Sequence, residues 1–237
     1  RYYSAYRALL EEGLNNPQVL DAIEECLEAS MHRLPTFKGR VMSLCDNSGS
    51  ARGTTVSTFS GVTVSTIANL TGILTGRQSE EGYVGLFGNN LDVHPVRKKD
   101  SILSSLSRLD EEGTKVGAST ENGIWLFWDK AIREKETWDH VFVYSDMQAG
   151  HGGLYGQDHS QYKEFLWQGS NHIDVGKLIK KYRQEVNPNV MVYLVQVAGY
   201  RDTILPEYFN RTFILGGWSE NVLKFAHEMS TMFEQLQ

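Results

Sequence analysis

Short apolar runs alternate with segments of helical periodicity along most of the chain. The run at 40–45 (RVMSLC) is nearly continuous in apolar residues, as is the run at 190–197 (VMVYLVQV). Such runs are typical of parallel strands that are buried on both faces of a sheet. The pattern predicts strands at 40–45, 82–88, 91–96, 140–146, 190–197 and, as an edge strand, 211–217.

Apolar residues at helical spacing fill the segments between these runs. The predicted helices cover 2–14, 18–34, 55–75, 101–112, 121–136, 174–186 and 219–236. Asn16 with Pro17 and, later, Ser219 are suited to begin helices. The segment 55–75 is rich in β-branched residues, but we expect a helix there because a helix follows a strand elsewhere in the chain.

Alternation of strands and helices predicts an α/β fold of the Rossmann-like, doubly wound type, with a mainly parallel sheet and helices on both faces. The GNN sequence at 88–90 is a tight turn, so the strands on either side of it form one antiparallel pair at the edge. We expect residues 1–39 to be a helical extension and residues 40–237 to be one domain.

Composition narrows the class of protein. The formal net charge of -6 disfavours binding of a nucleic-acid backbone by this segment itself. No apolar run approaches the roughly 18 residues of a membrane span, so no membrane association is expected. Cys26 and Cys45 have no metal-site spacing, which favours reduced thiols in a cytoplasmic protein. The chain begins at Arg1 without a methionine, so we expect it to be a piece of a longer protein.

Oxygen-bearing side chains gather at one expected edge of the sheet. Asp46, Ser48 and Ser50 follow the first strand as D-x-S-x-S, Asp146 ends a later strand, and Thr120 lies in the loop 116–123 before an expected helix. Ligands of doubly wound sheets bind outside the carboxyl ends of the strands. Two carboxylates and three hydroxyls suit Mg²⁺ better than zinc, and Mn²⁺ and Ca²⁺ accept the same oxygen ligands.

Each part of this set also has a purely structural explanation. Ser48, Ser50 and Thr54 could cap a helix, and for D-x-S-x-S alone the two explanations are about equally good. Thr120 by itself is more often an N-cap, and Asp146 by itself suits a turn. Their joint occurrence at the ends of expected strands is what favours a metal site.

The sequences DNSGS (46–50), GAST (117–120) and VYSD (143–146) resemble the metal-ion-dependent adhesion site of von Willebrand factor A domains. The resemblance extends from Arg40 to the C-terminus and implies the same α/β architecture. It implies that Ser48, Ser50 and Thr120 bind the cation directly, and that Asp46 and Asp146 bind it directly or through water. Ala51 stands where a methionine is common, and GAST replaces the more usual GGT, but neither change removes an oxygen ligand.

The leading segment, from RYYSAYRALL to LPTFKGRVMSLCDNSGS, is similar to the junction in TROVE-module proteins of the Ro autoantigen type. In that family, helical repeats that bind noncoding RNA lead into a C-terminal A domain. The resemblance implies that RNA binds the missing N-terminal part of the parent ribonucleoprotein component, and not this domain.

Other candidate sites are weaker. His151, His159 and His172 lie in or beside a long loop that also holds Asp158, but their spacing fits solvated loop residues better than a metal site. The basic helical face at 177–183 fits a solvated surface better than a phosphate contact.

No nucleophile elbow or phosphate-binding glycine loop follows the first strand, so we expect no enzyme. The expected function is a cation-dependent protein-interaction domain whose partner supplies an acidic side chain. The alternatives are a cation-dependent phosphohydrolase and a structural domain whose site is empty.

Overall fold

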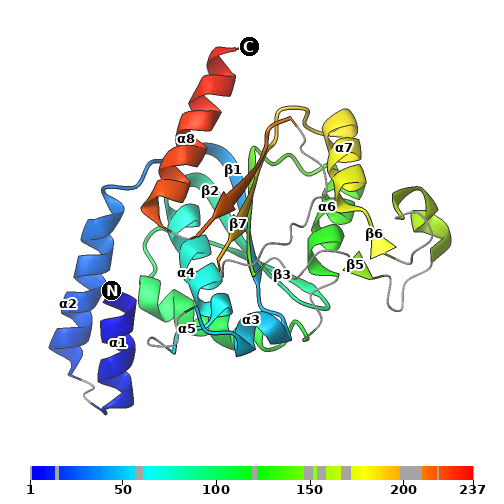
Figure 1. Cartoon of the computed structure of the whole chain (residues 1–237). Coiled ribbons are helices and arrows are strands. Elements are labelled where there is room, and N and C mark those ends of the chain that lie inside the picture. Colours follow the sequence, from blue (N-terminus) through cyan, green and yellow to red (C-terminus); the bar gives the residue numbers. More distant parts are fainter. Residues whose placement is uncertain are drawn as a thin grey trace.

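A six-stranded sheet runs through the centre of the molecule (Figure 1). The structure is a computed structural model that describes residues 2–13, 16–56, 61–118, 122–146, 152–153, 159–166, 172–197, 210–217 and 219–236. The sheet has the order β3-β2-β1-β4-β7-β8. Its strands are β1 (Phe37–Asp46), β2 (Ser79–Phe87), β3 (Leu91–Pro95), β4 (His140–Ser145), β7 (Met191–Gln196) and β8 (Thr212–Gly216).

Neighbouring strands of this sheet are parallel except for β2 and β3, which pair antiparallel. The chain moves from β1 outward to β2 and β3, and then returns to place β4 on the other side of β1. The strand order therefore reverses between β1 and β4. The doubly wound sheet with one antiparallel edge strand, predicted from the sequence, is confirmed.

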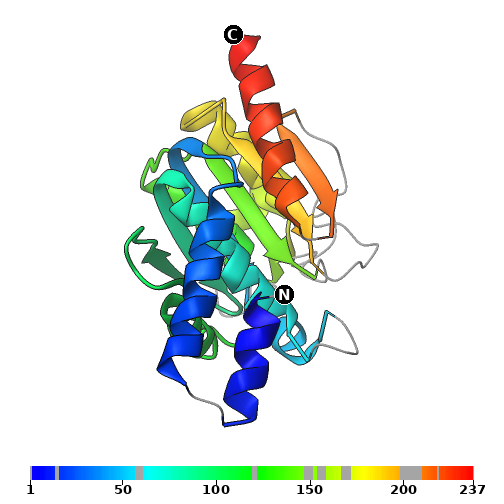
Figure 2. The same cartoon turned by 90° about the vertical axis from the view of Figure 1, so that its left-hand side faces the viewer.

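Helices cover both faces of the sheet, as Figures 1 and 2 show. On one face lie α4 (Val64–Arg77), α5 (Ile102–Gly113) and α8 (Glu220–Gln235), and on the other lie α6 (Gly123–Arg133) and α7 (Val175–Glu185). Along β1, Val41 and Cys45 belong to the first apolar cluster, whereas Met42 and Leu44 belong to the second. Because β1 is buried on both faces, its sequence is nearly continuous in apolar residues.

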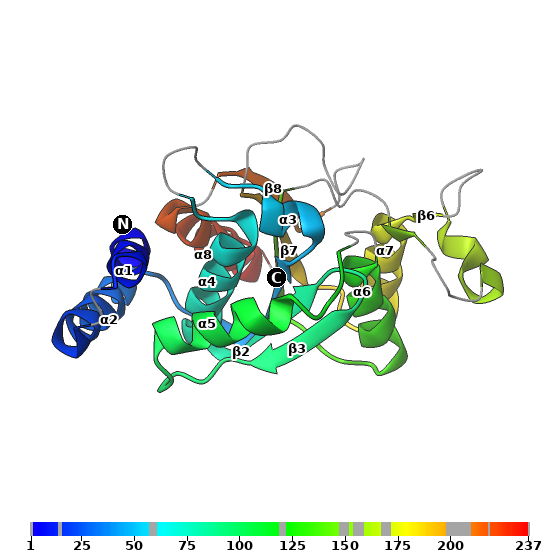
Figure 3. The same cartoon turned by 90° about the horizontal axis from the view of Figure 1, so that it is seen from below.

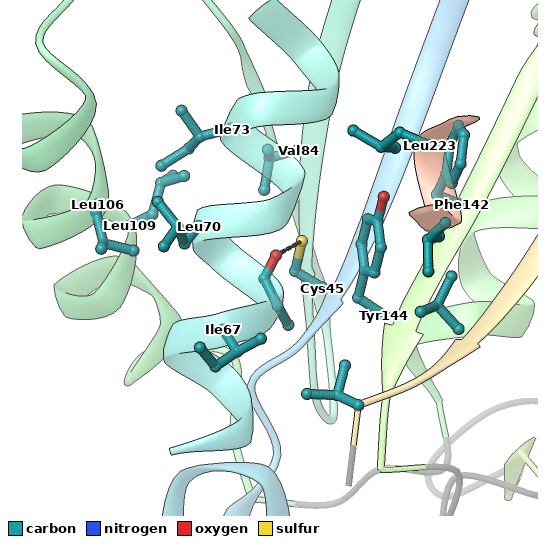
Figure 4. Packing of buried hydrophobic residues seen from close by; sticks show 14 of the residues in the cluster. Cys45, Ile67, Leu70, Ile73, Val84, Leu106, Leu109, Phe142, Tyr144 and Leu223 are labelled. Carbon is teal, nitrogen blue, oxygen red and sulfur yellow. Dashed lines mark hydrogen bonds between the residues drawn. The ribbon is translucent and has the colours of Figure 1, made fainter. Parts of the chain in front are cut away.

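Close packing of α4 against β1 depends on Gly72. A Cβ at this position would lie 2.6 Å from Cys45 Sγ, so no side chain fits there without movement. Cys45 is buried and its thiol donates to the carbonyl of Ala68 at 3.1 Å (Figure 4). Both Cys45 and the exposed Cys26 are free thiols.

Two helices precede the sheet, α1 (Tyr2–Glu11) and α2 (Pro17–Met31), and they lie outside α4 and α5 (Figure 2). The side chain of Asn16 accepts from Gln18 N at 3.0 Å, so the expected cap and the proline in the first turn of α2 are confirmed. An ion pair of 2.6 Å between Glu28 and Arg77 joins α2 to α4. The ion pair holds α2 against α4.

The predicted helix at 55–75 is wrong in its first part. The helix α4 begins only at Val64, and the hydroxyl of Thr63 accepts from Thr66 N at 3.3 Å as its cap. Ahead of it, Thr55 pairs with Thr63 as an antiparallel bridge, and Val56 N donates to Val62 O at 2.9 Å. The β-branched residues in this stretch favour such extended backbone over a helix.

Smaller elements complete the chain: α3 (Gly49–Gly53), a 3₁₀ helix η1 (His159–Phe165), and the two-residue strands β5 (Gly152–Gly153) and β6 (His172–Ile173). The loop predicted between 147 and 172 thus contains short elements of its own. The side chains of His151, Asp158 and His159 lie outside the described residues. None of the described helices is long and apolar enough to cross a membrane.

Candidate metal centre

Asp46 is the last residue of β1, at the point where the strand order of the sheet reverses. The neighbouring strand β4 ends one residue before Asp146, and Cys45 lies beside Tyr144 in the register of the two strands. Parallel strands therefore deliver Asp46 and Asp146 to the same edge, which faces the viewer in Figure 3, beside α3. Both carboxylates are fully buried. The convergence of these two acids, expected from the sequence, is present in the structure.

Both oxygens of Asp46 accept hydrogen bonds. Ser48 N donates to Oδ1 at 3.0 Å, and Ser145 Oγ donates to Oδ2 at 2.7 Å. The first bond closes a tight turn directly after the strand, and the second crosses to β4. Together they fix the plane of the carboxylate at the end of β1.

Burial raises the pKa of Asp46 to about 6, and the charge of Asp146 acts in the same direction, whereas the hydrogen bonds from Ser48 and Ser145 lower it. Two carboxyl groups that carry the same charge when ionised thus lie close together away from water. Such an arrangement is unfavourable for both charged forms unless a cation compensates them.

Two hydroxyls stand beside these acids. Ser48 Oγ and Ser50 Oγ are 3.2 Å apart. Adjacent corners of an octahedron around Mg²⁺ are about 3 Å apart when each oxygen lies about 2.1 Å from the ion. The spacing of the two hydroxyls therefore fits adjacent ligands of one magnesium ion.

The helix-cap explanation of the serines is also correct in part. Ser48 is the N-cap residue of α3, and its hydroxyl accepts from Ala51 N at 3.4 Å. A contact of this length is at the weak end of hydrogen bonding, and the hydroxyl oxygen has a second lone pair. Capping of the short helix α3 is thus compatible with cation binding by the same oxygen. Thr54 lies at the C-terminal end of α3.

Thr120 itself lies outside the described residues, but both sides of its loop are described. Gly49 N donates to Ala118 O at 2.8 Å, which joins the loop directly to the DNSGS turn. Gly123 N donates to Gly88 O at 3.2 Å. The helix α6 begins at Gly123 with Asn122 as its N-cap residue, so the expectation that Thr120 directly precedes a helix is wrong.

Ser145 and Asn47 are parts of this edge that sequence reasoning did not single out. Ser145 occurs within the VYSD sequence, yet only tertiary structure shows that its hydroxyl bonds to Asp46. Asn47 lies between Asp46 and Ser48 and is almost fully buried. A buried amide of this kind requires partners, which are Cys45 O and Asn69.

The donor set fits a hard divalent cation. Among the described residues, no group of three or more His, Cys, Asp and Glu side chains could hold a metal, so a centre here depends on hydroxyls in addition to two acids. Neutral hydroxyl and carboxylate oxygens are ligands for Mg²⁺, Mn²⁺ and Ca²⁺ rather than for zinc.

No family model matches the chain, and no curated protein matches it. Among solved structures, the chain is similar to the crystal structure of the Ro (RSR) protein of Deinococcus radiodurans, with a TM-score of 0.63 at 16% identity. The match covers 90% of this chain and 39% of that one. The chain has the fold of part of a Ro protein. The α/β architecture expected from the sequence is thereby confirmed, and it is shared with part of a Ro protein. The chain spans well under half the length of that neighbour.

Proposed function

We propose that this chain is a protein-interaction domain that binds a divalent cation at the edge formed by β1 and β4. The ion is Mg²⁺, which Mn²⁺ or Ca²⁺ can replace. Its ligands are Ser48, Ser50 and Thr120 directly, with Asp46 and Asp146 bound directly or through water. The observation that carries the proposal is the meeting of two buried acids with two hydroxyls 3.2 Å apart where the strand order reverses.

The partner in this proposal is a protein that supplies a glutamate or aspartate. Hydroxyl ligands are neutral, so they leave the cation with more of its positive charge than a shell of carboxylates would. Mg²⁺ also keeps several waters in protein sites, and an acidic side chain can replace one of them. An incoming carboxylate would thus complete the coordination shell and fix the partner's position.

We propose binding without turnover. Among the described residues, the Ser48 hydroxyl bonds to Ser50, to Ala51 N and to the carboxylate of Asp46. In the proposal this carboxylate binds the cation and does not act as a base, and no imidazole or amine that could act as a base is among these partners. An activated nucleophile needs such a base or a lowered pKa. A turnover assay with p-nitrophenyl phosphate and Mg²⁺ tests this part, and release of p-nitrophenol would favour the phosphohydrolase alternative.

The parent of this domain, in the proposal, is a Ro-like component of a cytoplasmic ribonucleoprotein. The fold shared with a Ro protein supports this, and the two free thiols suit a reducing compartment. RNA would bind to parts of the parent outside this chain, because a net charge of -6 opposes a phosphate backbone here.

Metal titration tests the central claim. Mn²⁺ is added to the metal-free protein, and free Mn²⁺ is followed by electron paramagnetic resonance, with Mg²⁺ as competitor. We expect one site per chain, lost in Asp46→Ala and weakened in Ser48→Ala. Asp21→Ala is the matched control, because Asp21 is an exposed aspartate on α2. Unchanged affinity in both site variants would overturn the proposed function.

A further inference from the structure

Asn47 joins the metal-site turn to the helices on one face of the sheet. Its side-chain amide donates to Cys45 O at 3.0 Å and to Asn69 Oδ1 at 2.8 Å. In return, Asn69 Nδ2 donates to Asn47 Oδ1 at 3.1 Å. The two amides therefore form a reciprocal pair between the DNSGS turn and α4. Both side chains are almost completely removed from water.

Two further residues, Asp110 and Thr66, extend this pair of amides into a larger network. Asn69 Nδ2 also donates to Asp110 Oδ1 on α5 at 2.7 Å, and Thr66 Oγ1 donates to Asp110 Oδ2 at 3.2 Å. Each of the two amide groups thus uses both of its N–H donors. The turn is connected to both α4 and α5 by a buried network in which every amide hydrogen has a partner, and such networks favour one arrangement over others.

The space for Asn47 is also specific. A Cβ on Gly113, the last residue of α5, would lie 2.1 Å from Asn47 Oδ1. Glycine at this position therefore allows the amide of Asn47 to reach Asn69. The main chain adds a further constraint, because Asn47 N donates to Phe87 O at 2.9 Å at the end of β2.

Asp110 is partly buried and has both polar and charged neighbours. Burial raises its pKa, while the hydrogen bonds from Asn69 and Thr66 and the charge of Arg7 on α1 lower it. Arg7 is itself held in place by a 2.8 Å bond from Nη1 to Gly61 O.

We propose that Asn69 and Asp110 are positioning residues of the metal site. Through Asn47 they hold the turn 46–50 in the conformation that brings Ser48 and Ser50 together at one cation. Metal affinity then depends on two side chains that do not touch the metal. This inference rests on the proposed function, since it names what prepares the same site. Substitution of comparable outer residues in metal sites lowers affinity by roughly tenfold to a hundredfold.

The test compares four variants. Asn69→Leu keeps the approximate size of the side chain and removes all its hydrogen bonds. Gly113→Ala acts on Asn47 from the other side. Asp110→Asn is the conservative variant, because an amide can still accept from Asn69. The matched control is Thr75→Val on the same helix: Thr75 is fully buried and bonds to Tyr144 and Thr71 O, away from the turn.

Mn²⁺ affinity is measured for each variant, and thermal stability is measured in EDTA. We expect Asn69→Leu and Gly113→Ala to lower Mn²⁺ affinity by roughly tenfold or more. Asp110→Asn should keep most of the wild-type affinity. Thr75→Val should lose stability and keep the affinity of the wild type. Wild-type affinity in Asn69→Leu, or an equal loss of affinity in Thr75→Val, would overturn the inference. If Asn69→Leu does not fold, the pair Gly113→Ala and Asp110→Asn decides in the same way.

A metal-free measurement separates this inference from the proposed function. The amides of Gly49 and Arg52 bond to Ala118 O and Ser48 O, so their hydrogen exchange in EDTA reports the position of the turn. We expect faster exchange at both amides in Asn69→Leu, with no change at Val192 in β7. If the wild type binds no Mn²⁺, the proposed function fails, and this exchange experiment alone decides whether the network holds the turn. Unchanged exchange at Gly49 and Arg52 would overturn the positioning role.

Discussion

The hydroxyl of Ser145 donates to the carboxylate of Asp46 at 2.7 Å, across the two strands between which the order of the sheet reverses. This bond joins β1 to its neighbour β4, and both partners are fully buried. It holds the carboxylate of Asp46 in one orientation beside Asp146, at the site of the proposed cation.

Ser145→Ala tests how much this hydrogen bond contributes to Mn²⁺ binding and to the free energy of unfolding. A hydrogen bond to a charged group contributes about 1.5–3 kcal/mol, and the alanine variant leaves Asp46 Oδ2 without that donor. We expect weaker Mn²⁺ binding and a lower free energy of unfolding in EDTA at pH 7.5, measured by urea denaturation.

Ser43→Ala is the matched control for Ser145→Ala. Ser43 lies on β1, is fully buried, and its hydroxyl has no hydrogen-bond partner within the described part of the chain. Removal of an unpaired buried hydroxyl should leave stability unchanged or raise it by about 1 kcal/mol. A loss in Ser43→Ala as large as that in Ser145→Ala would show that the strand, and not the Asp46 bond, is sensitive.

Acid should destabilise the fold through His140. Burial lowers the pKa of this imidazole from 6.5 to about 4, and its neighbours are Phe37, Tyr193, His227 and the charge of Asp139. Because the folded pKa is lowered, the stability from the neutral form is fully present above pH 6.5 and is lost as the pH falls toward 4. The loss is about 3 kcal/mol at most, from 1.36 kcal/mol per pKa unit.

Urea denaturation of wild type and His140→Phe at pH 7.5, 6 and 5 measures this effect. The phenylalanine variant should lose less stability than the wild type over this range, because it has no proton to take up on unfolding. Parallel pH profiles for the two proteins would contradict the assignment to His140.

Glu24 should stabilise the packing of α2 against α5. Its two carboxylate oxygens accept from Ile102 N and Leu103 N at the start of α5. A carboxylate at a helix N-terminus satisfies free N–H groups and interacts favourably with the helix dipole. We expect Glu24→Ala to lower stability by about 1–2 kcal/mol. Glu25→Ala, an exposed neighbour on α2, should change the urea midpoint little.

Substitutions at Gly72 and Cys45 should have coupled effects on the free energy of unfolding. Gly72→Ala places a methyl group 2.6 Å from Cys45 Sγ and should cost about 1–3 kcal/mol, as overpacked cores do. Cys45→Ala removes the sulfur and makes room for that methyl group. In a double-mutant cycle by urea denaturation, the pair should cost less than the sum of the single changes. Additive costs would show that the close approach at this point is not responsible.

The sequence by itself determined most of the helices and strands and the class of fold. Buried runs such as 40–45 and 190–197 have no polar face to offer water, so they had to become internal strands. Asn16 and Ser219 could be assigned as caps because their side chains bond to amides only two residues away. The D-x-S-x-S turn could be recognised for the same reason, since its spacing is local. Thr120 as a ligand stays a prediction.

Tertiary structure decided the rest. The segment 55–75 was predicted as a helix from the strand-then-helix pattern, whereas in the structure Thr55 pairs with Thr63 and the helix begins at Val64. The bonds from Ser145 to Asp46 and from Asn69 to Asn47 join residues 99 and 22 positions apart. No local pattern specifies such contacts, because they arise only when the strand order places β4 beside β1 and when α4 packs against the end of β1.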